Sequence, residues 1–379
     1  MSLRLVALLV VLGACPAPKP PKPPQKPAGT IAVQGPGQPQ ISWSRVEAPS
    51  DVPATPPEPG TYRIHLIDVG TGLSILVQGS DFNLLYDAGT NDKEEKPIRI
   101  LAYLARAVGA SGDDLCGEKS DQRKLIGNVV LSHPHFDHGS AIDLVVHCYD
   151  VKDIWDSGRV NETAFYRSFI ESVSKSAATY HTAASVPSDH VQAVKGAELV
   201  VPKWERFSEG DTIQLGAGAK FTILHAEGKQ VKDINENSVV IVVELGGAHL
   251  LLVGDSPSGE RRDPSNPAGE VEQFLIDSHA KDIRADILQV GHHGSKTSSR
   301  RAFLEAVHPS LALVSSGPKQ YGKTILPDAE VIEELHRVGA TVLRTDERDA
   351  DCPHAKIGPA DGPGGCDTYI ITVRPAPPR

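Results

Sequence analysis

From residue 62 onward, the chain alternates between short apolar runs and longer segments in which apolar residues recur at helical spacing. The runs YRIHLIDVG, LSILVQ and FNLLYDAG, within residues 62–89, are typical of strands and are separated by turns that contain Gly or Asp. Residues 96–110, KPIRILAYLARAVGA, show helical apolar spacing after a proline near their start. The pattern predicts three strands followed by a helix.

The same alternation continues toward the C-terminus. Residues 128–133 predict a strand, residues 139–148 and 162–180 predict helices, and a polar stretch without a clear period follows. Four consecutive strands are predicted within residues 212–256, and strands then alternate with helices through residue 373. Two runs of strands, each followed by such alternation, indicate an α/β fold of two packed mixed sheets with external helices.

The N-terminal segment has the features of an export signal. Residues 1–15, MSLRLVALLVVLGAC, combine one positive charge with an apolar core that is too short for a membrane span of roughly 20 residues. The ending LGAC resembles the lipobox of bacterial lipoproteins, whose cysteine is lipidated, although Cys15 could also be incidental to an ordinary signal peptide. We expect a lipoprotein anchored through Cys15 that faces the periplasm or the cell exterior, with no transmembrane helix in the mature chain.

Prolines dominate the next segment. Residues 16–60 hold 14 of the chain's 30 prolines, and proline supplies no amide donor for a helix or a ladder. We therefore predict an extended, semi-rigid tether over residues 16–60 and a folded domain over residues 61–379.

Composition and charge exclude few classes of protein. The 379 residues are 40% hydrophobic and 23% charged, as in a globular protein, and the net charge of −10 argues against broad nonspecific nucleic-acid binding. Four further cysteines indicate disulfides in an exported protein. Proximity in the sequence favours pairing Cys352 with Cys366, which leaves Cys116 with Cys148. No CxxC spacing occurs, so a cysteine-based zinc site is not expected.

The candidate chemistry begins in LSHPHFDHGS, residues 131–140. This segment places His133, His135, Asp137 and His138 at the end of a predicted strand and before a helix. Imidazole and carboxylate are the ligands that zinc and related divalent ions prefer, and two neighbouring ions would need this density of ligands. The alternative is a chance group of solvated polar residues.

The pattern HxHxDH resembles the signature of the metallo-β-lactamase superfamily. Further segments follow in the order and spacing of one branch, the hydrolase domain of the ComEC competence proteins and its free-standing relatives. The resemblance covers residues 62–346 and includes IHLIDVGTGLSILV, LLYDAGT, NENSVVIVVELGGAHLLLVGDS, ADILQVGHHGSKTSS and FLEAVHPSLALVSSGPKQYG. It implies an αββα sandwich and metal-dependent hydrolysis.

The resemblance also implies roles for particular residues. His133 and His135 are the expected ligands of a first metal, and Asp137 and His138 those of a second. Asp255, after the apolar strand LLLVG, matches the carboxylate that bridges both ions; the alternative is a turn or helix-capping residue.

The pair His292–His293 matches the last metal motif. We expect His292 to be the second metal's ligand and His293 to be a ligand or a contact to a substrate phosphate, although the two roles could be exchanged. Asp137, Asp255 and His293 are the candidate catalytic residues, with either aspartate able to steer a water proton.

One departure from the wider superfamily concerns the first metal. Many superfamily members have a further histidine between the cluster and the bridging aspartate, whereas this chain has Asn235-Glu236-Asn237-Ser238. His225 lies nearby without an evident metal role in the family. We therefore expect one or two divalent ions, with zinc favoured and manganese as the alternative.

Residues near the site suggest how a substrate is held. Asp87 resembles an aspartate that orients ligand histidines, with a strand-end turn as the alternative. Ser295 and Lys296 lie at a predicted helix start suited to an anionic group, with capping as the alternative. Lys323 stands where family members commonly have a histidine, and a cation there could hold a phosphate.

These expectations favour a metal-dependent hydrolase outside the cytoplasm that cleaves a phosphodiester, including single-stranded DNA, with a metal-activated hydroxide. Divalent ions lower the pKa of bound water to about 7. One alternative is a hydrolase of another ester, a lactone or a phosphorylcholine-type substrate, and another is a noncatalytic surface-tethered binding module. The sequence does not predict the oligomeric state.

Overall fold

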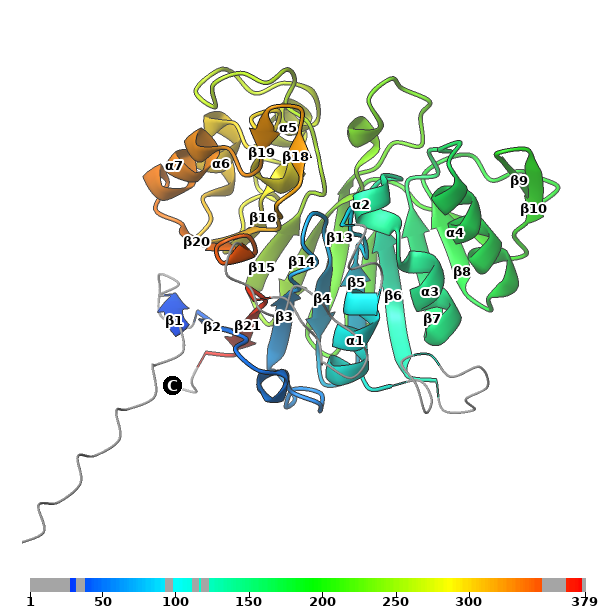
Figure 1. Cartoon of the computed structure of the whole chain (residues 1–379), viewed down its shortest axis with the longest axis horizontal. Helices are drawn as coiled ribbons and strands as arrows, with labels where there is room; N and C mark the ends of the chain where they lie inside the picture. The colour runs from blue at the N-terminus through cyan, green and yellow to red at the C-terminus, as the bar shows by residue number, and fades with distance from the viewer. Residues whose placement is uncertain are drawn as a thin grey trace, which may run out of the picture.

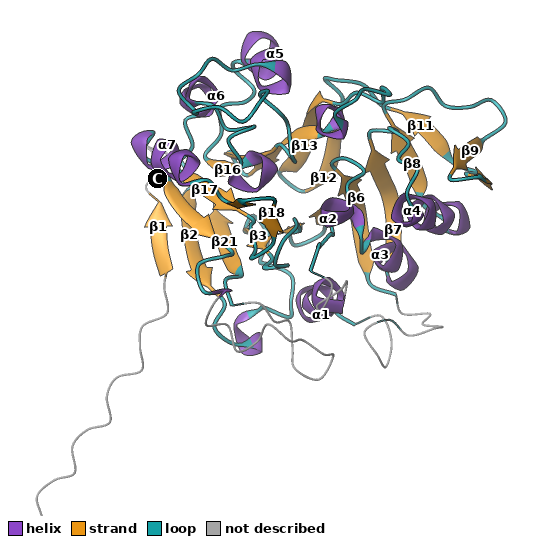
Figure 2. Cartoon of the chain, turned by 45° about the horizontal axis from the view of Figure 1, so that its top comes forward, coloured by secondary structure: helices purple, strands orange, loops and turns teal. Residues whose placement is uncertain are grey.

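A computed structural model shows two β-sheets packed face to face, with helices on both outer sides (Figure 1). It describes residues 28–31, 38–92, 98–110, 116, 123–349 and 366–376. This arrangement is the predicted αββα sandwich of two mixed sheets with external helices, and Figure 2 shows the helices outside the strands.

The first sheet has ten strands in the order β1-β2-β21-β3-β4-β5-β6-β7-β8-β11. Its pairings are antiparallel from β1 to β5 and parallel from β5 to β11. The strands are β1 Ala28–Ile31, β2 Gln40–Arg45, β3 Tyr62–Leu66, β4 Ile75–Gln78, β5 Asn83–Tyr86, β6 Leu125–Leu131, β7 Asp150–Asp156, β8 Thr179–Thr182, β11 Trp204–Arg206 and β21 Tyr369–Arg374.

The second sheet has seven strands in the order β12-β13-β14-β15-β16-β17-β20. Its pairings are antiparallel up to β15 and parallel from β15 to β20. The strands are β12 Thr212–Gly216, β13 Ala219–His225, β14 Val240–Leu245, β15 Ala248–Leu252, β16 Ile287–Gln289, β17 Leu311–Val314 and β20 Thr341–Arg344.

Two short hairpins stand apart from these sheets, and helices cover the sheets. The hairpins pair β9 Val191–Val194 with β10 Ala197–Val200, and β18 Gln320–Tyr321 with β19 Thr324–Ile325. The helices are α1 Ile98–Ala107, α2 Phe136–Gly139, α3 Ile142–Cys148, α4 Ala164–Lys175, α5 Glu270–His279, α6 Arg301–Val307 and α7 Ala329–Arg337, with 3-10 turns η1 Pro49–Asp51, η2 Ile234–Asn237 and η3 Gly291–Gly294.

The apolar runs bury both faces of their strands. In β4, Ile75 and Val77 join the core between the sheets, whereas Leu76 joins the core beneath the helices of the first sheet. In β15, Leu252 faces the same central core and Leu251 packs beneath the helices of the second sheet. Successive strand side chains point to opposite faces, so continuous apolar runs are what a four-layer fold requires.

The predicted tether is wrong for its second half. β1 and β2 lie within residues 16–60, and β2 pairs with the C-terminal strand β21 over residues 40–45 and 369–374. Ile41 is fully buried in the core between the sheets. The reason is that residues 40–45 have the alternating pattern QISWSR, and the prolines of residues 28–60 all fall outside the two strands. Residues 1–27, including the expected signal segment and Cys15, lie outside the described residues.

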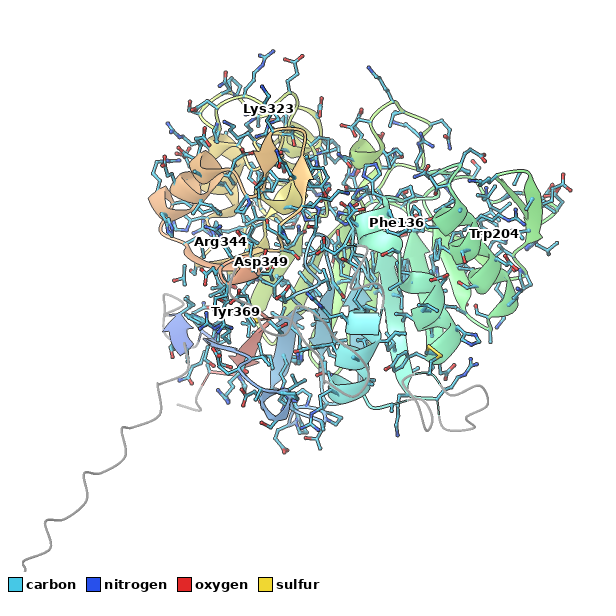
Figure 3. All side chains as sticks on the ribbon, in the orientation of Figure 1. Phe136, Trp204, Lys323, Arg344, Asp349 and Tyr369 are labelled. Carbon is cyan, nitrogen blue, oxygen red and sulfur yellow. A yellow bond between two sulfur atoms is a disulfide. The ribbon has the colours of Figure 1, made fainter. Side chains whose placement is uncertain are left out.

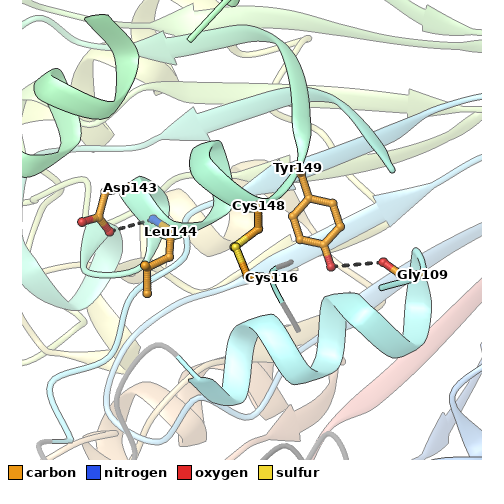
Figure 4. Close-up of a disulfide and its surroundings, with 6 residues drawn as sticks. All are labelled: Gly109, Cys116, Asp143, Leu144, Cys148 and Tyr149. Atoms are coloured by element: carbon orange, nitrogen blue, oxygen red, sulfur yellow. Dashed lines mark hydrogen bonds between the residues drawn. A yellow bond between two sulfur atoms is a disulfide. The ribbon is translucent and has the colours of Figure 1, made fainter. Parts of the chain in front are cut away.

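A disulfide joins Cys116 to Cys148, as predicted, with a sequence separation of 32 residues (Figure 4). Cys148 ends α3, and the hydroxyl of the next residue, Tyr149, donates to the Gly109 carbonyl at 3.3 Å. These links fasten the end of α3 to the segment that follows α1. The other expected pair, Cys352 with Cys366, cannot be followed because Cys352 lies outside the described residues.

Among the described helices, none is both long and apolar enough to cross a bilayer.

Candidate metal centre

The carboxyl ends of parallel strands from both sheets meet at one edge of the sandwich. β5 is followed by Asp87 and β6 by Ser132 and His133, while Asp255 follows β15 and the pair at 292–293 follows β16. Carboxyl ends of parallel strands lie together, so the loops after them converge on a common crevice. Figure 1 shows α2, which carries part of the HxHxDH motif, at this upper edge.

Six of the predicted site residues form two groups that could hold metal ions. Within each group, one ligand atom of every residue lies within 4.8 Å of the others. The first group is His133, His135 and Asp255, and the second is Asp137, His138 and His293.

Asp255 faces both groups. Its Oδ2 lies 3.8 Å from His133 Nε2 and 3.7 Å from His293 Nε2, and its Oδ1 lies 3.2 Å from His138 Nε2. The side chain is buried at the centre of the cluster. This is the position that the resemblance assigns to a bridging carboxylate.

Outer partners fix the ring orientation of two histidines. His138 Nδ1 lies 2.7 Å from Asp87 Oδ2, and His293 Nδ1 lies 2.9 Å from the Ser315 carbonyl oxygen. A carboxylate and a carbonyl only accept hydrogen bonds, so each imidazole donates from Nδ1 and turns the lone pair of Nε2 inward. Such orientation is typical of histidines that bind metals.

The donor set fits a divalent cation. The Nε2 atoms of His138 and His293 lie 3.3 Å apart, and with Nδ1 as the donor on both rings these two atoms face each other as acceptors. Oδ1 of Asp255 is buried and accepts no hydrogen bond of good geometry within the described part of the chain. Facing acceptors repel unless a proton or a cation lies between them, and a divalent cation removes that repulsion while also satisfying the buried oxygen.

The electrostatics of the cluster point the same way. Burial, reinforced by neighbouring histidines, lowers the pKa of His133 well below its usual value. Burial opposes ionisation of Asp255, yet His138 and His293 hold the pKa of that carboxyl well below its usual range. Burial also opposes the charge of His138, but Asp255 and Asp87 outweigh it and raise the pKa of the imidazole. The site therefore favours positive charge between its carboxylates.

Backbone conformation separates the two histidines of the GHHG turn. His292 and His293 both have left-handed φ angles, 49° and 54°, which are strained for non-glycine residues. His293 is buried and joins the second group, whereas the side chain of His292 is 27% exposed and its Nδ1 lies 2.8 Å from Thr297 Oγ1. His292 Nε2 remains 3.7 Å from Asp255 Oδ2. The geometry thus favours the exchanged order, with His293 at the ligand position and His292 facing the opening.

Glycines let the loops close tightly around the motif. A Cβ on Gly89 would lie 2.3 Å from the Asp137 carbonyl carbon, and one on Gly72 would lie 2.2 Å from the Gly89 oxygen. The Leu73 amide donates to the Asp137 carbonyl at 3.0 Å. These contacts hold the backbone of the second group in place.

The segment 235–238 lies beside the cluster, since the Val239 amide donates to the Ser132 carbonyl at 2.8 Å. Asn235 Oδ1, Asn237 Nδ2 and Ser238 Oγ are buried without a hydrogen-bond partner among the described residues. His225 belongs to neither group. Its Nδ1 lies 2.9 Å from the Ser238 carbonyl, and its ring packs against that of Phe274.

The predicted substrate residues are placed less favourably. The expected helix start at Ser295 and Lys296 is wrong, because α6 begins at Arg301 and a non-helical turn precedes it. Ser295 is buried and accepts from Arg261 at 3.1 Å, and Lys296 Nζ pairs with Glu330 at 2.7 Å. Both side chains are therefore engaged elsewhere.

Sequence reasoning missed three residues that support the ligands. Ser132 donates its backbone amide and its hydroxyl to Asp87, each at 2.7 Å. Asn91 Nδ2 donates to Asp137 Oδ2 at 2.7 Å, and the Tyr321 hydroxyl lies 3.2 Å from the same oxygen. Asn91 and Tyr321 lie in a loop and a hairpin with no sequence period. Only their closeness in the fold reveals them.

Fold and site together define a two-sheet α/β protein with a histidine–aspartate centre for divalent metal. Residues 67–317 match the family model described as the metallo-beta-lactamase superfamily. The chain belongs to this superfamily, whose members are mostly metal-dependent hydrolases that hold one or two ions.

The relatives include competence proteins. The chain is 25% identical over 287 residues to "Recombination protein 2" of Haemophilus influenzae, covering 75% of this chain and 28% of the relative. It is 32% identical over 143 residues to "ComE operon protein 3" of Bacillus subtilis, covering 38% of this chain and 16% of the relative. The chain thus spans less than a third of the length of these relatives. The metallo-beta-lactamase fold protein YhfI of Bacillus subtilis aligns with a TM-score of 0.41 at 12% identity, covering 75% of this chain and 96% of that one.

Proposed function

We propose that this protein is a metal-dependent phosphodiesterase. The observation that carries the proposal is the convergence of His133, His135, Asp137, His138, Asp255 and His293 in two groups that could hold metal ions at the carboxyl edge of both sheets. Similarity to "Recombination protein 2" of Haemophilus influenzae and to "Competence protein ComA" of Neisseria gonorrhoeae makes a phosphodiester such as single-stranded DNA the first substrate class to test.

The proposed chemistry divides between the ion and the protein. One or two divalent ions, zinc or manganese, would supply hydroxide at neutral pH and stabilise negative charge in the transition state. Asp137 Oδ2, fixed by Asn91, would accept the proton of the attacking water. His292, partly exposed beside Asp255, would contact the substrate phosphate, the role first considered for His293.

A substrate panel tests the proposal. Full-length protein loaded with Zn²⁺ or Mn²⁺ is assayed with bis-p-nitrophenyl phosphate, single-stranded DNA, p-nitrophenyl phosphorylcholine and a lactone. His135→Ala and Asp255→Ala should abolish turnover, whereas His336→Ala, on the exposed side of α7, should not. Lactone turnover without phosphodiester turnover would favour a different hydrolase. Inertness of the wild type toward every substrate would favour a binding module.

We further propose that the protein is exported and lipidated at Cys15. The support is the sequence of residues 1–15. Incorporation of labelled palmitate into the wild type but not into Cys15→Ser would support the proposal. Equal labelling of both, or labelling of neither, would refute it.

A further inference from the structure

Most of the exposed large apolar side chains belong to the HxHxDH motif or to the β18–β19 hairpin, whose Tyr321 contacts Asp137. Five large apolar side chains of the described residues are exposed, and three of them are Phe136 at 49%, Tyr321 at 38% and Ile325 at 57%. Phe136 lies between two residues of the metal groups, and Tyr321 reaches Asp137 with its hydroxyl. Such clustering at a polar site indicates contact with a ligand rather than incidental exposure.

Phe136 belongs to the N-terminal half of the chain. It is the first residue of α2, and its ring meets the edge of the Phe165 ring on α4 at a centroid distance of 5.7 Å. This contact supports the ring from one side, while half of its surface stays open to solvent. Phe136 is therefore a rigid, flat apolar surface directly beside the ligands.

The β18–β19 hairpin belongs to the C-terminal half of the chain. Lys319 Nζ lies 4.9 Å from the centroid of the Tyr321 ring, and Lys323 is exposed at the turn. Neither lysine forms an ion pair with any described residue, and residues 317–327 contain no acidic side chain. Gly322, which forms the turn together with Lys323, has open space around it. In a chain of net charge −10, this hairpin is a local basic and aromatic surface.

The two surfaces belong to opposite halves of the molecule. Figure 3 shows Phe136 by α2 and Lys323 on the hairpin of the C-terminal half. The Tyr321 hydroxyl, 3.2 Å from Asp137 Oδ2, fixes its ring at the edge of the second metal group. Phe136 directly precedes Asp137 in the chain, so both exposed rings adjoin the same candidate metal ligand.

We propose that Phe136 and Tyr321 stack unpaired nucleobases beside the metal centre while Lys319 and Lys323 contact the flanking phosphates. This inference rests on the proposed phosphodiesterase function and specifies its substrate as a single-stranded polynucleotide. Stacking on aromatic side chains combined with backbone contacts to cations is how proteins bind single strands without sequence preference. Duplex DNA is excluded from this mode because its bases are already stacked on each other.

A small quaternary ammonium substrate is the competing occupant of an aromatic pair. The structure disfavours it, because the Tyr321 ring already has the Lys319 ammonium near it and a second cation would be repelled. The observed charge suits an anionic polymer better.

The test compares two substrates of equal length, an oligothymidylate and an abasic sugar–phosphate oligomer. The wild type should prefer the base-bearing oligomer in kcat/KM by roughly 5- to 150-fold, the range that stacking of one base provides. Phe136→Ala should lose most of this preference, and Phe136→Tyr should restore it. Leu125→Ala, an exposed apolar position at the opposite end of β6, should leave the preference unchanged.

Further measurements keep the inference falsifiable if Phe136→Ala does not fold. Tyr321→Ala should also reduce the preference, and Lys323→Gln should lower the slope of log affinity against log salt by about 0.7. Equal turnover of both oligomers by a wild type that hydrolyses bis-p-nitrophenyl phosphate would overturn the stacking inference alone. A wild type inert toward every phosphodiester would overturn both proposals. A selective loss of p-nitrophenyl phosphorylcholine turnover in Phe136→Ala, with the base preference intact, would assign the rings to the quaternary ammonium.

Discussion

The buried carboxylate of Asp87 allows a direct test of how the protein orients His138 for metal binding. Its Oδ2 accepts from His138 Nδ1 and from the Ser132 hydroxyl, and its Oδ1 accepts from the Ser132 amide. In Asp87→Asn, the amide group would replace Oδ2, because Oδ1 must still accept from the backbone. An amide nitrogen donates, so the His138 tautomer would switch and place its proton on Nε2, which faces the metal position.

The magnitude follows from the lost bond. To bind a metal through Nε2, His138 must carry its proton on Nδ1. In the variant this proton faces the N–H groups of the introduced amide, which cannot accept it, so the 2.7 Å hydrogen bond at this position is lost. A hydrogen bond to a charged group contributes about 1.5–3 kcal/mol, which corresponds to roughly 10- to 150-fold in affinity. This agrees with the ~10- to 100-fold that removal of such supporting partners usually costs.

The assay is competition with a chromophoric zinc chelator, together with urea unfolding in excess chelator to record any loss of stability. Asp156→Asn is the matched control, because Asp156 is a buried aspartate at the end of β7 that accepts from Tyr166 and Tyr180 and belongs to neither metal group. It should change stability but not zinc affinity. A folded Asp87→Asn with wild-type zinc affinity would refute the tautomer argument.

Two further predictions concern stability. Burial, followed by the charge of Arg63, lowers the pKa of His65 from 6.5 to about 3, so the unfolded chain binds a proton first as the pH falls below about 7. The free energy of unfolding should therefore drop by about 2 kcal/mol between pH 7.5 and pH 5 through this group. In urea titrations, a His65→Gln variant should lack this part of the pH dependence, whereas the exposed control His336→Gln should keep it. The same pH dependence in the wild type and in His65→Gln would contradict this. Replacing Cys116 and Cys148 by alanine should cost about 3–4 kcal/mol, since the bond closes a 32-residue separation; an unchanged urea midpoint would show that the bond does not constrain the unfolded chain.

Local pattern predicts β3 to β6, β12 to β17, β20 and β21, but it does not predict β1, β2, β7, β8 or β11, and β8 overlaps the end of the helix expected over residues 162–180. Strand ends at Asp87, His133 and Asp255 were readable because continuous apolar runs stop there and polar residues follow, and both sheets place those ends on the same edge. The Cys116–Cys148 bond was also predicted correctly. These features depend on residues near one another in the chain or on a spacing that the fold preserves.

Two features that local pattern does not predict depend on contacts over long separations. Residues 40–45 were assigned to a tether because prolines surround them, and only the partner strand β21, more than 300 residues later, makes them part of the sheet. Likewise, no local signal places Tyr321 beside Asp137. Both contacts arise only once distant segments of the chain come together in the fold.

The adjacent histidines at 292 and 293 show why a motif alone leaves chemistry open. In a regular strand, one of two neighbouring side chains faces each side, and sequence cannot tell which side holds the metal. In the structure, both residues have left-handed backbone angles, and the Ser315 carbonyl, just after β17, holds His293 Nδ1 so that His293 joins the second group. Because that partner is a backbone carbonyl, which every residue type has, the identity of residue 315 gives no sign of the contact in the sequence. The His293 orientation is thus set by the strand order β16-β17, which makes the second metal group a property of the sheet as much as of the motif.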